Sequence, residues 1–356
     1  PAAPSRRGFV IRRLPAAGYD RKLISTDTQE AAPRKRFPSW LLPAIGYAVS
    51  LASLYWVYQG FDWKEQLPRV ARTDLRWVSL AMLSDIAVYV CQGARWRYLL
   101  QPLARVTTWK ATQAVYIGIF ANEVLPLRTG EIIRIYLMRK WSGLPLPVVF
   151  SSAVIERLMD GIWLVLCFYA ATLLVNLPGW LEGASHVLMI VLAMIAALVL
   201  WAVLHKSHAH AAVKGSRWGG MLRHVVDGVH DMGRSRSFLI SFLISGLHLA
   251  LQIVPLWALM KGFQLDRTPW EAAAVLAVLR IGTILPQAPG NVGSFQALVL
   301  VGLGALGVDR GTATGFATLL FFVITVPLWM AGFVALMLTR MRLTDLQRDA
   351  QREELA

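Results

Sequence analysis

The sequence predicts an all-α polytopic membrane protein with about six full spans and two re-entrant helical hairpins arranged as an inverted repeat. Three observations predict this fold. Of the 356 residues, 56% are hydrophobic and 16% are charged, whereas a soluble domain is about 45–50% apolar and about 25% charged. The mean hydropathy is +0.50. The apolar residues fall into stretches of spanning length, and two shorter stretches end in matching breaks.

Six apolar stretches are long enough to cross a bilayer, which takes about 20 helical residues for roughly 30 Å of hydrocarbon. In chain order they are residues 40–61, 77–94, 147–175, 186–204, 238–260 and 312–338. The third is the longest, so we expect it to tilt. The second is followed by Arg95, Trp96 and Arg97, which we assign to a connection outside the membrane.

Two shorter apolar stretches, residues 110–125 and 270–285, end at breaks that share one pattern. A Pro is followed four residues later by a Gly, as Pro126 and Gly130 in the first break and as Pro286 and Gly290 in the second. Interrupted backbone at membrane depth is tolerated only where protein or a wet cavity covers it. Paired interrupted segments at corresponding positions of two halves indicate a transporter site.

We expect each broken segment to turn back as a helical hairpin. The return helices are predicted over residues 131–138 and 294–308, and Pro289 and Gly293 complete the second break. The two repeat units are then 77–175 and 238–338, of opposite orientation. The alternative is that both broken segments are ordinary full spans.

The distribution of Lys and Arg predicts the orientation. With both termini in the cytoplasm, the 95–110 connection, Arg139, Lys140 and the basic 205–236 loop all lie inside, as positively charged loops do. The first hairpin then opens inward and the second outward. The 62–76 connection falls outside although it carries four Lys and Arg residues, which departs from the rule.

The flanking segments are polar. Residues 1–39 hold nine Lys and Arg residues without an apolar stretch of signal-peptide length, and they predict a disordered basic cytoplasmic tail. Residues 40–340 form the predicted transmembrane domain, and 341–356 a charged cytoplasmic tail. The net charge of +15 is segregated around the spans, which favours anionic lipid headgroups as partners and not nucleic acid.

Ionisable residues within the apolar segments predict a substrate site. Such residues are costly in a membrane and normally face a protein interior or a water-filled cavity. Arginine suits two-pronged contact with phosphate, carboxylates can serve as counter-ions or proton carriers, and helix ends exposed at a break favour an anion. The expected site residues are Asn122, Arg128, Glu131, Arg134, Glu156, Arg157, Asp160 and Arg280. The alternative is that these residues form structural ion pairs.

Three sequence runs carry a family resemblance: GIFANEVLPLRTGEIIRIYLMRK, VIERLMDG and PQAPGNVGSFQ. They resemble the flippase-like transmembrane family, which includes the membrane half of lysyl-phosphatidylglycerol synthases (MprF-type proteins) and stand-alone relatives. The resemblance covers roughly residues 40–340. It implies movement of a lipid or a lipid-linked headgroup between leaflets. The family often has Glu shortly after the second glycine motif, where this chain has Gln296.

The sequence therefore predicts a transporter in a bacterial cytoplasmic (inner) membrane that moves a phosphate-bearing lipid through a polar cavity. A phospholipid, a polyprenyl-phosphate lipid and a hopanoid-type lipid all remain open as substrates, and so does a homo-oligomeric state. No catalytic residue, metal or cofactor is expected, and no aminoacyl-transfer domain. The alternatives are an integral-membrane transferase that uses polyprenyl-phosphate-linked donors, and an ion- or proton-coupled solute transporter.

Overall fold

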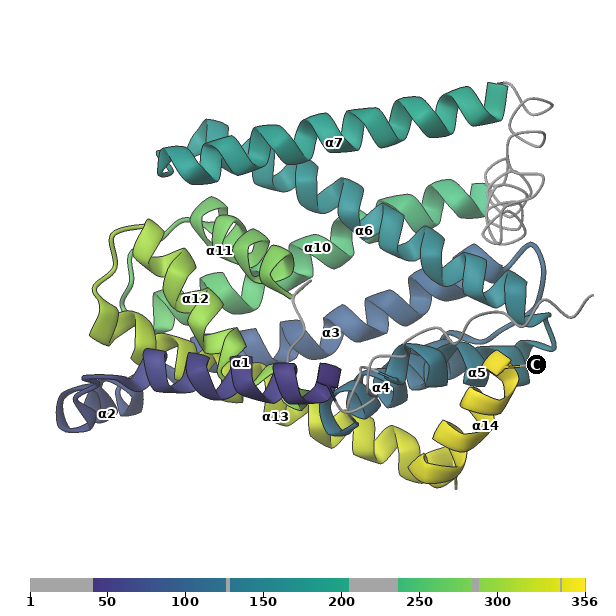
Figure 1. Ribbon diagram of the computed structural model, residues 1–356, viewed down its shortest axis with the longest axis horizontal. Helices are drawn as coiled ribbons and strands as arrows, with labels where there is room; N and C mark the ends of the chain where they lie inside the picture. The colour runs from purple at the N-terminus through teal and green to yellow at the C-terminus, as the bar shows by residue number, and fades with distance from the viewer. Residues whose placement is uncertain (1–40, 126–128, 205–235, 284–287, 340, 356) are drawn as a thin grey trace, which may run out of the picture. The chain divides into compact units, whose positions relative to one another are not determined.

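The computed structural model describes residues 41–125, 129–204, 236–283, 288–339 and 341–355 (Figure 1). All regular structure in these ranges is helical. The elements are α1 (Leu41–Tyr58), α2 (Trp63–Ala71), α3 (Leu75–Leu100), α4 (Thr108–Val124), α5 (Gly130–Ser142), α6 (Leu146–Leu174), α7 (Gly179–Leu204), α10 (Arg236–Gly262), α11 (Pro269–Gly282), η2 (Pro289–Asn291), α12 (Ser294–Ala305), α13 (Arg310–Thr339) and α14 (Leu343–Leu355). The predicted basic tail 1–39 lies outside the described residues.

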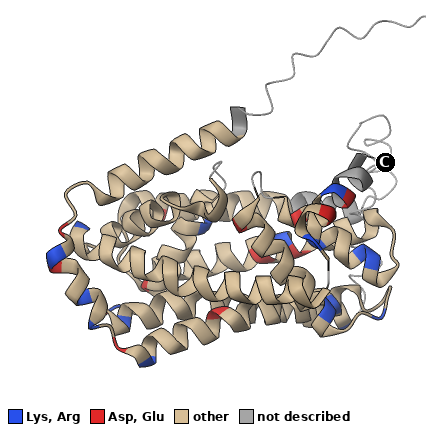
Figure 2. Cartoon of the chain, turned by 90° about the horizontal axis from the view of Figure 1, so that it is seen from below, with Lys and Arg blue, Asp and Glu red and all other residues tan. Residues whose placement is uncertain are grey.

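Four of the described helices are long and apolar enough to cross a membrane, namely α3, α6, α10 and α13. They have 26 to 30 residues and are therefore about 39–45 Å long at 1.5 Å per residue, more than the roughly 30 Å hydrocarbon core. Figure 2 shows that most residues along the helices are uncharged and that Lys, Arg, Asp and Glu gather at helix ends and in a few groups.

The segments predicted as the 62–76 connection and the 341–356 tail each contain a helix. The predicted 62–76 connection contains α2, whose first turn is capped by the Asp62 side chain accepting from the amides of Lys64 and Glu65. The predicted charged tail 341–356 contains α14, whose Leu346 is 2% exposed and packs in the core formed largely by α4 and α5. Each of these short, charged helices buries one side chain against the rest of the protein, Gln66 in α2 and Leu346 in α14.

The assignment of Arg95 to a connection is wrong. Helix α3 continues to Leu100, and Arg95 lies within it with 0% of its surface exposed. A buried guanidinium is tolerated only where opposite charge and hydrogen bonds compensate the lost hydration. Those partners come from α6 and α10, which are far from Arg95 in sequence.

Helices α3 and α10 pack against each other as an antiparallel pair. Going along α3 toward its C-terminus, Ser84 Oγ donates to Leu251 O (2.9 Å), and a His248 ring nitrogen lies 3.1 Å from Val88 O. Further along, Cys91 Sγ lies 3.8 Å from Ile244 O. The partner number falls as the α3 number rises, so corresponding helices of the two predicted units run in opposite directions.

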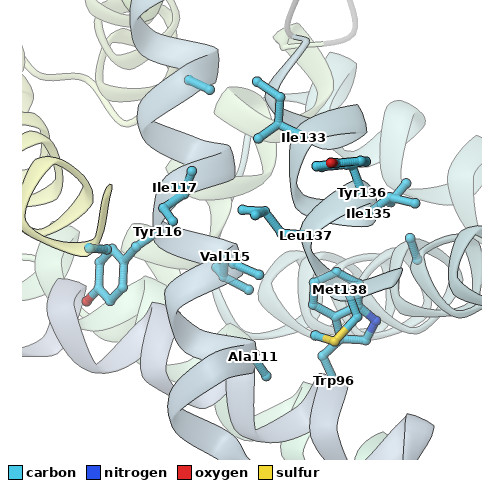
Figure 3. Packing of buried hydrophobic residues seen from close by; sticks show 14 of the residues in the cluster. Trp96, Ala111, Val115, Tyr116, Ile117, Ile133, Ile135, Tyr136, Leu137 and Met138 are labelled. Atoms are coloured by element: carbon cyan, nitrogen blue, oxygen red, sulfur yellow. The ribbon is translucent and has the colours of Figure 1, made fainter. Parts of the chain in front are cut away.

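The other contacts between helices of the two predicted units come in corresponding pairs. Helix α4 packs against α13, and its counterpart α11 packs against α6. In the same way α3 contacts α13 while α10 contacts α6. One apolar cluster surrounds α4 and α5 and includes Trp96, Val115, Ile117, Leu137 and Met138 (Figure 3). A second surrounds α10 to α13.

Helices α4 and α5 also pack antiparallel, and glycines set their close approach. A Cβ at Gly118 would lie 2.8 Å from Arg134 Cβ, and one at Gly130 would lie 2.7 Å from Asn122 Oδ1 and even closer to Gly118 O. Helices α11 and α12 are paired similarly, where Gly302 faces Val275. The two broken segments are therefore two pairs of adjacent antiparallel helices.

Gly130→Ala is expected to destabilise the protein by about 1–3 kcal/mol, the usual cost of adding a methyl group to a closely packed contact. The matched control is Gly161→Ala in α6, where a Cβ meets nothing within 4 Å and helix propensity favours alanine by about 0.5–1 kcal/mol. Thermal unfolding of the detergent-purified protein measures both. Equal melting temperatures for the two variants would contradict the close approach of α4 and α5.

The described residues of the second break have the backbone that glycine permits. Gly290 has φ 73° and Gly293 has φ 84°, in the left-handed region, and Pro289 begins η2. A Cβ at Gly293 would lie 2.9 Å from Leu54 Cγ, and Ser50 Oγ of α1 accepts from the Ala288 amide (3.2 Å). The second break therefore packs on α1. Pro126 and Pro286 lie outside the described residues.

Candidate functional site

Six charged side chains from α3, α5 and α6 form one ion-pair network. Three are basic and three are acidic, so their formal charges cancel. They are Arg95, Glu131, Arg134, Glu156, Arg157 and Asp160. Five of these six residues are among the predicted site residues, and the structure brings all five together.

Glu156 is the centre of the buried part of this network. Its Oε1 accepts from Arg95 Nε (3.3 Å) and Nη2 (3.2 Å), and its Oε2 lies 3.2 Å from Arg134 Nη2. Glu156 and Arg95 are 0% exposed, and Arg134 is 1% exposed. The contact to Arg134 is an ion pair that lacks hydrogen-bond geometry. Both guanidinium groups are thus held inside the protein by carboxylates.

Arg157 lies in the exposed part of the network. Its side chain is 53% exposed, against 38% for Glu131 and 24% for Asp160. It donates to Glu131, and its Nη1 lies 3.8 Å from Asp160 Oδ2. Protein atoms nevertheless surround Arg157 densely. Of the three arginines in the network, Arg157 is the one with an exposed side chain.

Local structure fixes the buried arginines. Arg134 follows Glu131 by three residues on α5, and its Nε lies 2.8 Å from Glu131 Oε2. Its guanidinium carbon lies 4.9 Å from the Trp96 ring centroid, and Trp96 Nε1 donates to Ser152 Oγ (2.9 Å). Helix α3 thus supplies Trp96 as a support for Arg134 and the neighbouring Arg95 as a partner for Glu156.

Asn122 connects the two sides of the first break. Its Oδ1 accepts from the Gly130 amide (2.8 Å), an N–H of the first turn of α5 that has no partner within its own helix. Asn122 therefore acts as a cap across the break. Arg128, which the sequence also placed here, lies outside the described residues.

Arg280 makes no direct contact with the network among the described residues. Its side chain is exposed and donates to Gln252 Oε1, and no hydrogen bond or ion pair between described residues joins it to the six charged groups. Its electrostatic neighbours include Asp85 and Asp160. Asp85 is 7% exposed, and its Oδ2 accepts no hydrogen bond from any described residue.

Gln296 has a structural role at the second break. Its Oε1 accepts from the Gly293 amide (2.7 Å), which caps the start of α12. An amide oxygen performs this capping as a carboxylate would.

Arg95 is the network residue that sequence reasoning missed. The sequence does contain a signal for it, because Asp85 and Gln92 lie seven residues apart on one face of α3, and Arg95 follows Gln92 by three. Residues three, four and seven apart share a helix face. Extending this polar face by one step would have placed Arg95 inside the helix.

An apolar groove with a volume of about 530 Å³ lies beside the network, between α6, α10 and the start of α11. Its lining contains no charged residue and includes Trp163, Cys167, Ala250, Trp257 and Trp270. Among the residues the structure describes, no group of three or more His, Cys, Asp or Glu side chains is placed to hold a metal ion.

Long apolar helices around a buried ionic network define a multi-pass helical membrane protein with a polar centre. The chain belongs to the family of the lysylphosphatidylglycerol synthase TM region, whose model matches residues 44–332. The resemblance stated from the sequence motifs is therefore confirmed.

Three curated proteins show what the chain is similar to. A UPF0104 membrane protein of Methanocaldococcus jannaschii is 20% identical over 85% of this chain and 95% of its own length. Another, from Methanothermobacter thermautotrophicus, is 22% identical over 66% of this chain and 75% of its own length. Glycosyltransferase AglD of Haloferax volcanii is 28% identical over 40% of this chain and 22% of its own length. No solved structure matches the chain.

Proposed function

We propose that this protein moves a phosphate-bearing lipid, or a lipid-linked headgroup, between the two leaflets of a membrane. The headgroup binds at the exposed side of the ion-pair network, and the observation that supports this assignment most is the exposure of the Arg157 side chain. Arginine has five N–H donors in a planar arrangement that matches phosphate oxygens two at a time. Arg157 contacts Glu131 and Asp160, and its exposed surface is free to meet a ligand.

The carboxylates of the network keep Arg157 in place when no substrate is bound. An unpaired guanidinium at membrane depth is costly, so Glu131 and Asp160 serve as its counter-ions between substrates. An entering phosphate exchanges for these carboxylates, which are themselves partly exposed and can be hydrated. Arg95 and Arg134 remain buried on Glu156 and hold α3, α5 and α6 together around the exchange site.

The helix arrangement supports two inverted units with re-entrant hairpins. Corresponding helices α3 and α10 run antiparallel, and each exchanges equivalent contacts with the last helix of the other unit. Helices α4, α5, α11 and α12 have 17, 13, 14 and 12 residues, shorter than the roughly 20 needed for a full crossing. Inverted repeats with a site at broken helices are the geometry of alternating-access transporters.

Proteoliposomes test the proposed transfer directly. Vesicles that contain the purified protein and a trace of fluorescent phosphatidylglycerol or polyprenyl phosphate are treated with a membrane-impermeant quencher, which reports the lipid in the outer leaflet. We expect transfer that rises with the protein-to-lipid ratio, because each copy adds a path for the headgroup. Protein-free vesicles and heat-denatured protein are the controls. Transfer of every tested lipid at the protein-free rate would reject the proposal.

The similarity to glycosyltransferase AglD favours one second candidate, an integral-membrane transferase that uses polyprenyl-phosphate-linked donors. The matched region is 22% of that protein, so its activity is a proposal for this chain. The same exposed arginine would bind the donor phosphate. Incubation of the purified protein with a polyprenyl-phosphate-linked sugar and membrane extract tests it, because a new glycosylated product would favour the transferase over the transporter.

A further inference from the structure

The apolar groove between α6, α10 and the start of α11 begins within one helical turn of the ion-pair network. On α6, Trp163 lines the groove and follows Asp160 by three residues. On α10, Gly246 lines it and follows Ser245, whose Oγ lies 3.2 Å from Arg95 Nη1. The groove therefore begins next to the ion-pair network that contains the site proposed for the headgroup.

Trp163 lies at the boundary between the groove and the ion-pair network. Its Nε1 donates to Phe242 O (2.9 Å), so its polar edge is satisfied by α10. Its ring crosses α10 where no side chain intervenes, since a Cβ at Gly246 would lie 2.9 Å from Trp163 Cζ2. The indole thus presents an apolar face to the groove at the boundary with the charged groups.

The dimensions and the far end of the groove suit a hydrocarbon chain. From Gly246 to Trp257 the lining follows α10 for eleven residues, which is about 16 Å and close to half of the roughly 30 Å hydrocarbon core. Trp257 and Trp270 line the far end, and tryptophan is enriched at membrane interfaces. Ala250 lies between Gly246 and Trp257 along α10 and is exposed, so the groove opens sideways.

We propose that this groove holds one hydrocarbon chain of the lipid whose phosphate binds at Arg157. The inference rests on the proposed function and adds to it a second point of recognition, since a ligand with charge at one end and a long apolar chain at the other matches both parts of the surface.

A photoactivatable lipid tests this assignment in proteoliposomes of the full chain. The probe is phosphatidylglycerol with a diazirine in one acyl chain, and the control probe is diacylglycerol with the same diazirine and no phosphate. We expect peptides that contain Cys167 and Ala250 to be labelled several-fold more by the phosphate-bearing probe. In Arg157→Ala this excess is expected to disappear, because the headgroup is no longer held.

A pair of α10 variants adds an independent measurement. Ala250→Trp fills the groove, whereas Leu247→Trp places the same side chain at a position that is 55% exposed and does not line it. We expect Ala250→Trp to lower groove labelling and lipid transfer several-fold, and Leu247→Trp to change neither. The labelling of the unmodified protein stands as a test even where Ala250→Trp does not fold.

Every other outcome either supports or overturns the assignment of a lipid chain to the groove. Equal labelling by both probes, unchanged in Arg157→Ala, identifies bulk bilayer lipid in the groove and overturns the assignment. An unlabelled groove together with Ala250→Cys disulfide dimers identifies a second copy of the chain there, with the same consequence. Normal transfer with an unlabelled groove removes this inference alone. Phosphate-dependent labelling without transfer removes the transport proposal and leaves the lipid site.

Discussion

Arg157→Ala is expected to reduce lipid transfer by about 10- to 100-fold while the protein keeps its fold. The loss corresponds to one charge-assisted hydrogen bond to phosphate, at about 1.5–3 kcal/mol, since about 1.4 kcal/mol is a factor of ten. The fold survives because the Arg157 side chain is 53% exposed, and exposed ion pairs contribute little to stability. The quencher assay on proteoliposomes measures transfer, and thermal unfolding in detergent measures the fold.

Two further variants sharpen this test. Arg157→Lys keeps the charge but loses the two-pronged geometry, so we expect partial activity. Arg76→Ala removes an exposed arginine from the first turn of α3, outside the network, and is expected to transfer lipid normally. Full activity in Arg157→Ala, with the variant inserted and folded, would refute the assignment of the headgroup to this residue.

Arg95→Met is expected to destabilise the protein by about 3–5 kcal/mol, which is the cost of removing one partner from a buried ion pair. The substitution keeps the apolar stem but leaves Glu156, which is 0% exposed, with Arg134 as its ion-pair partner. Ser245 also loses a hydrogen bond from Arg95. Denaturant unfolding followed by tryptophan fluorescence measures the change, and poor expression is its first sign.

The matched control is Arg97→Met, two residues further along α3. Arg97 is partly exposed and makes a hydrogen bond to Thr108 Oγ1 (3.3 Å), so its loss is expected to cost about 0.5 kcal/mol or less. The double variant Arg95→Met with Glu156→Gln is expected to recover part of the stability, because it no longer buries an excess negative charge. Equal stability of Arg95→Met and Arg97→Met would show that Arg95 is not buried in an ion pair.

The two predictions separate two uses of the same residue type. Arg95 and Arg134 hold helices together because carboxylates already occupy them and solvent does not reach them. Arg157 differs in exposure and not in chemistry. The sequence-based site grouped Arg134 with Arg157 as phosphate contacts, and in the proposed mechanism only Arg157 takes that role, while Arg134 positions Glu131 and Glu156.

Several features followed from the sequence alone because they depend on local physics. Hydrophobic length predicted helices at all six expected spans, with ends that differ from the prediction by at most seven residues. The left-handed backbone at Gly290 and Gly293 agrees with the second break. Spacing along one helix placed Glu131 and Arg134 within reach of each other, because residues three apart share a face whatever packs against it.

Tertiary structure decided which charges are buried and which are exposed. Arg95, Arg134 and Arg157 look alike in sequence, and their exposures of 0%, 1% and, for the Arg157 side chain, 53% follow from which helix lies opposite each of them. Glu156 meets Arg95 across 61 positions of the chain, a pairing that no local rule predicts. Likewise, Gly246 and Trp163, which both line the groove beside the network, lie on different helices, and the missing side chain of Gly246 lets α10 approach Trp163. Charge and helix length are properties of a segment, whereas burial is a property of the whole packed molecule.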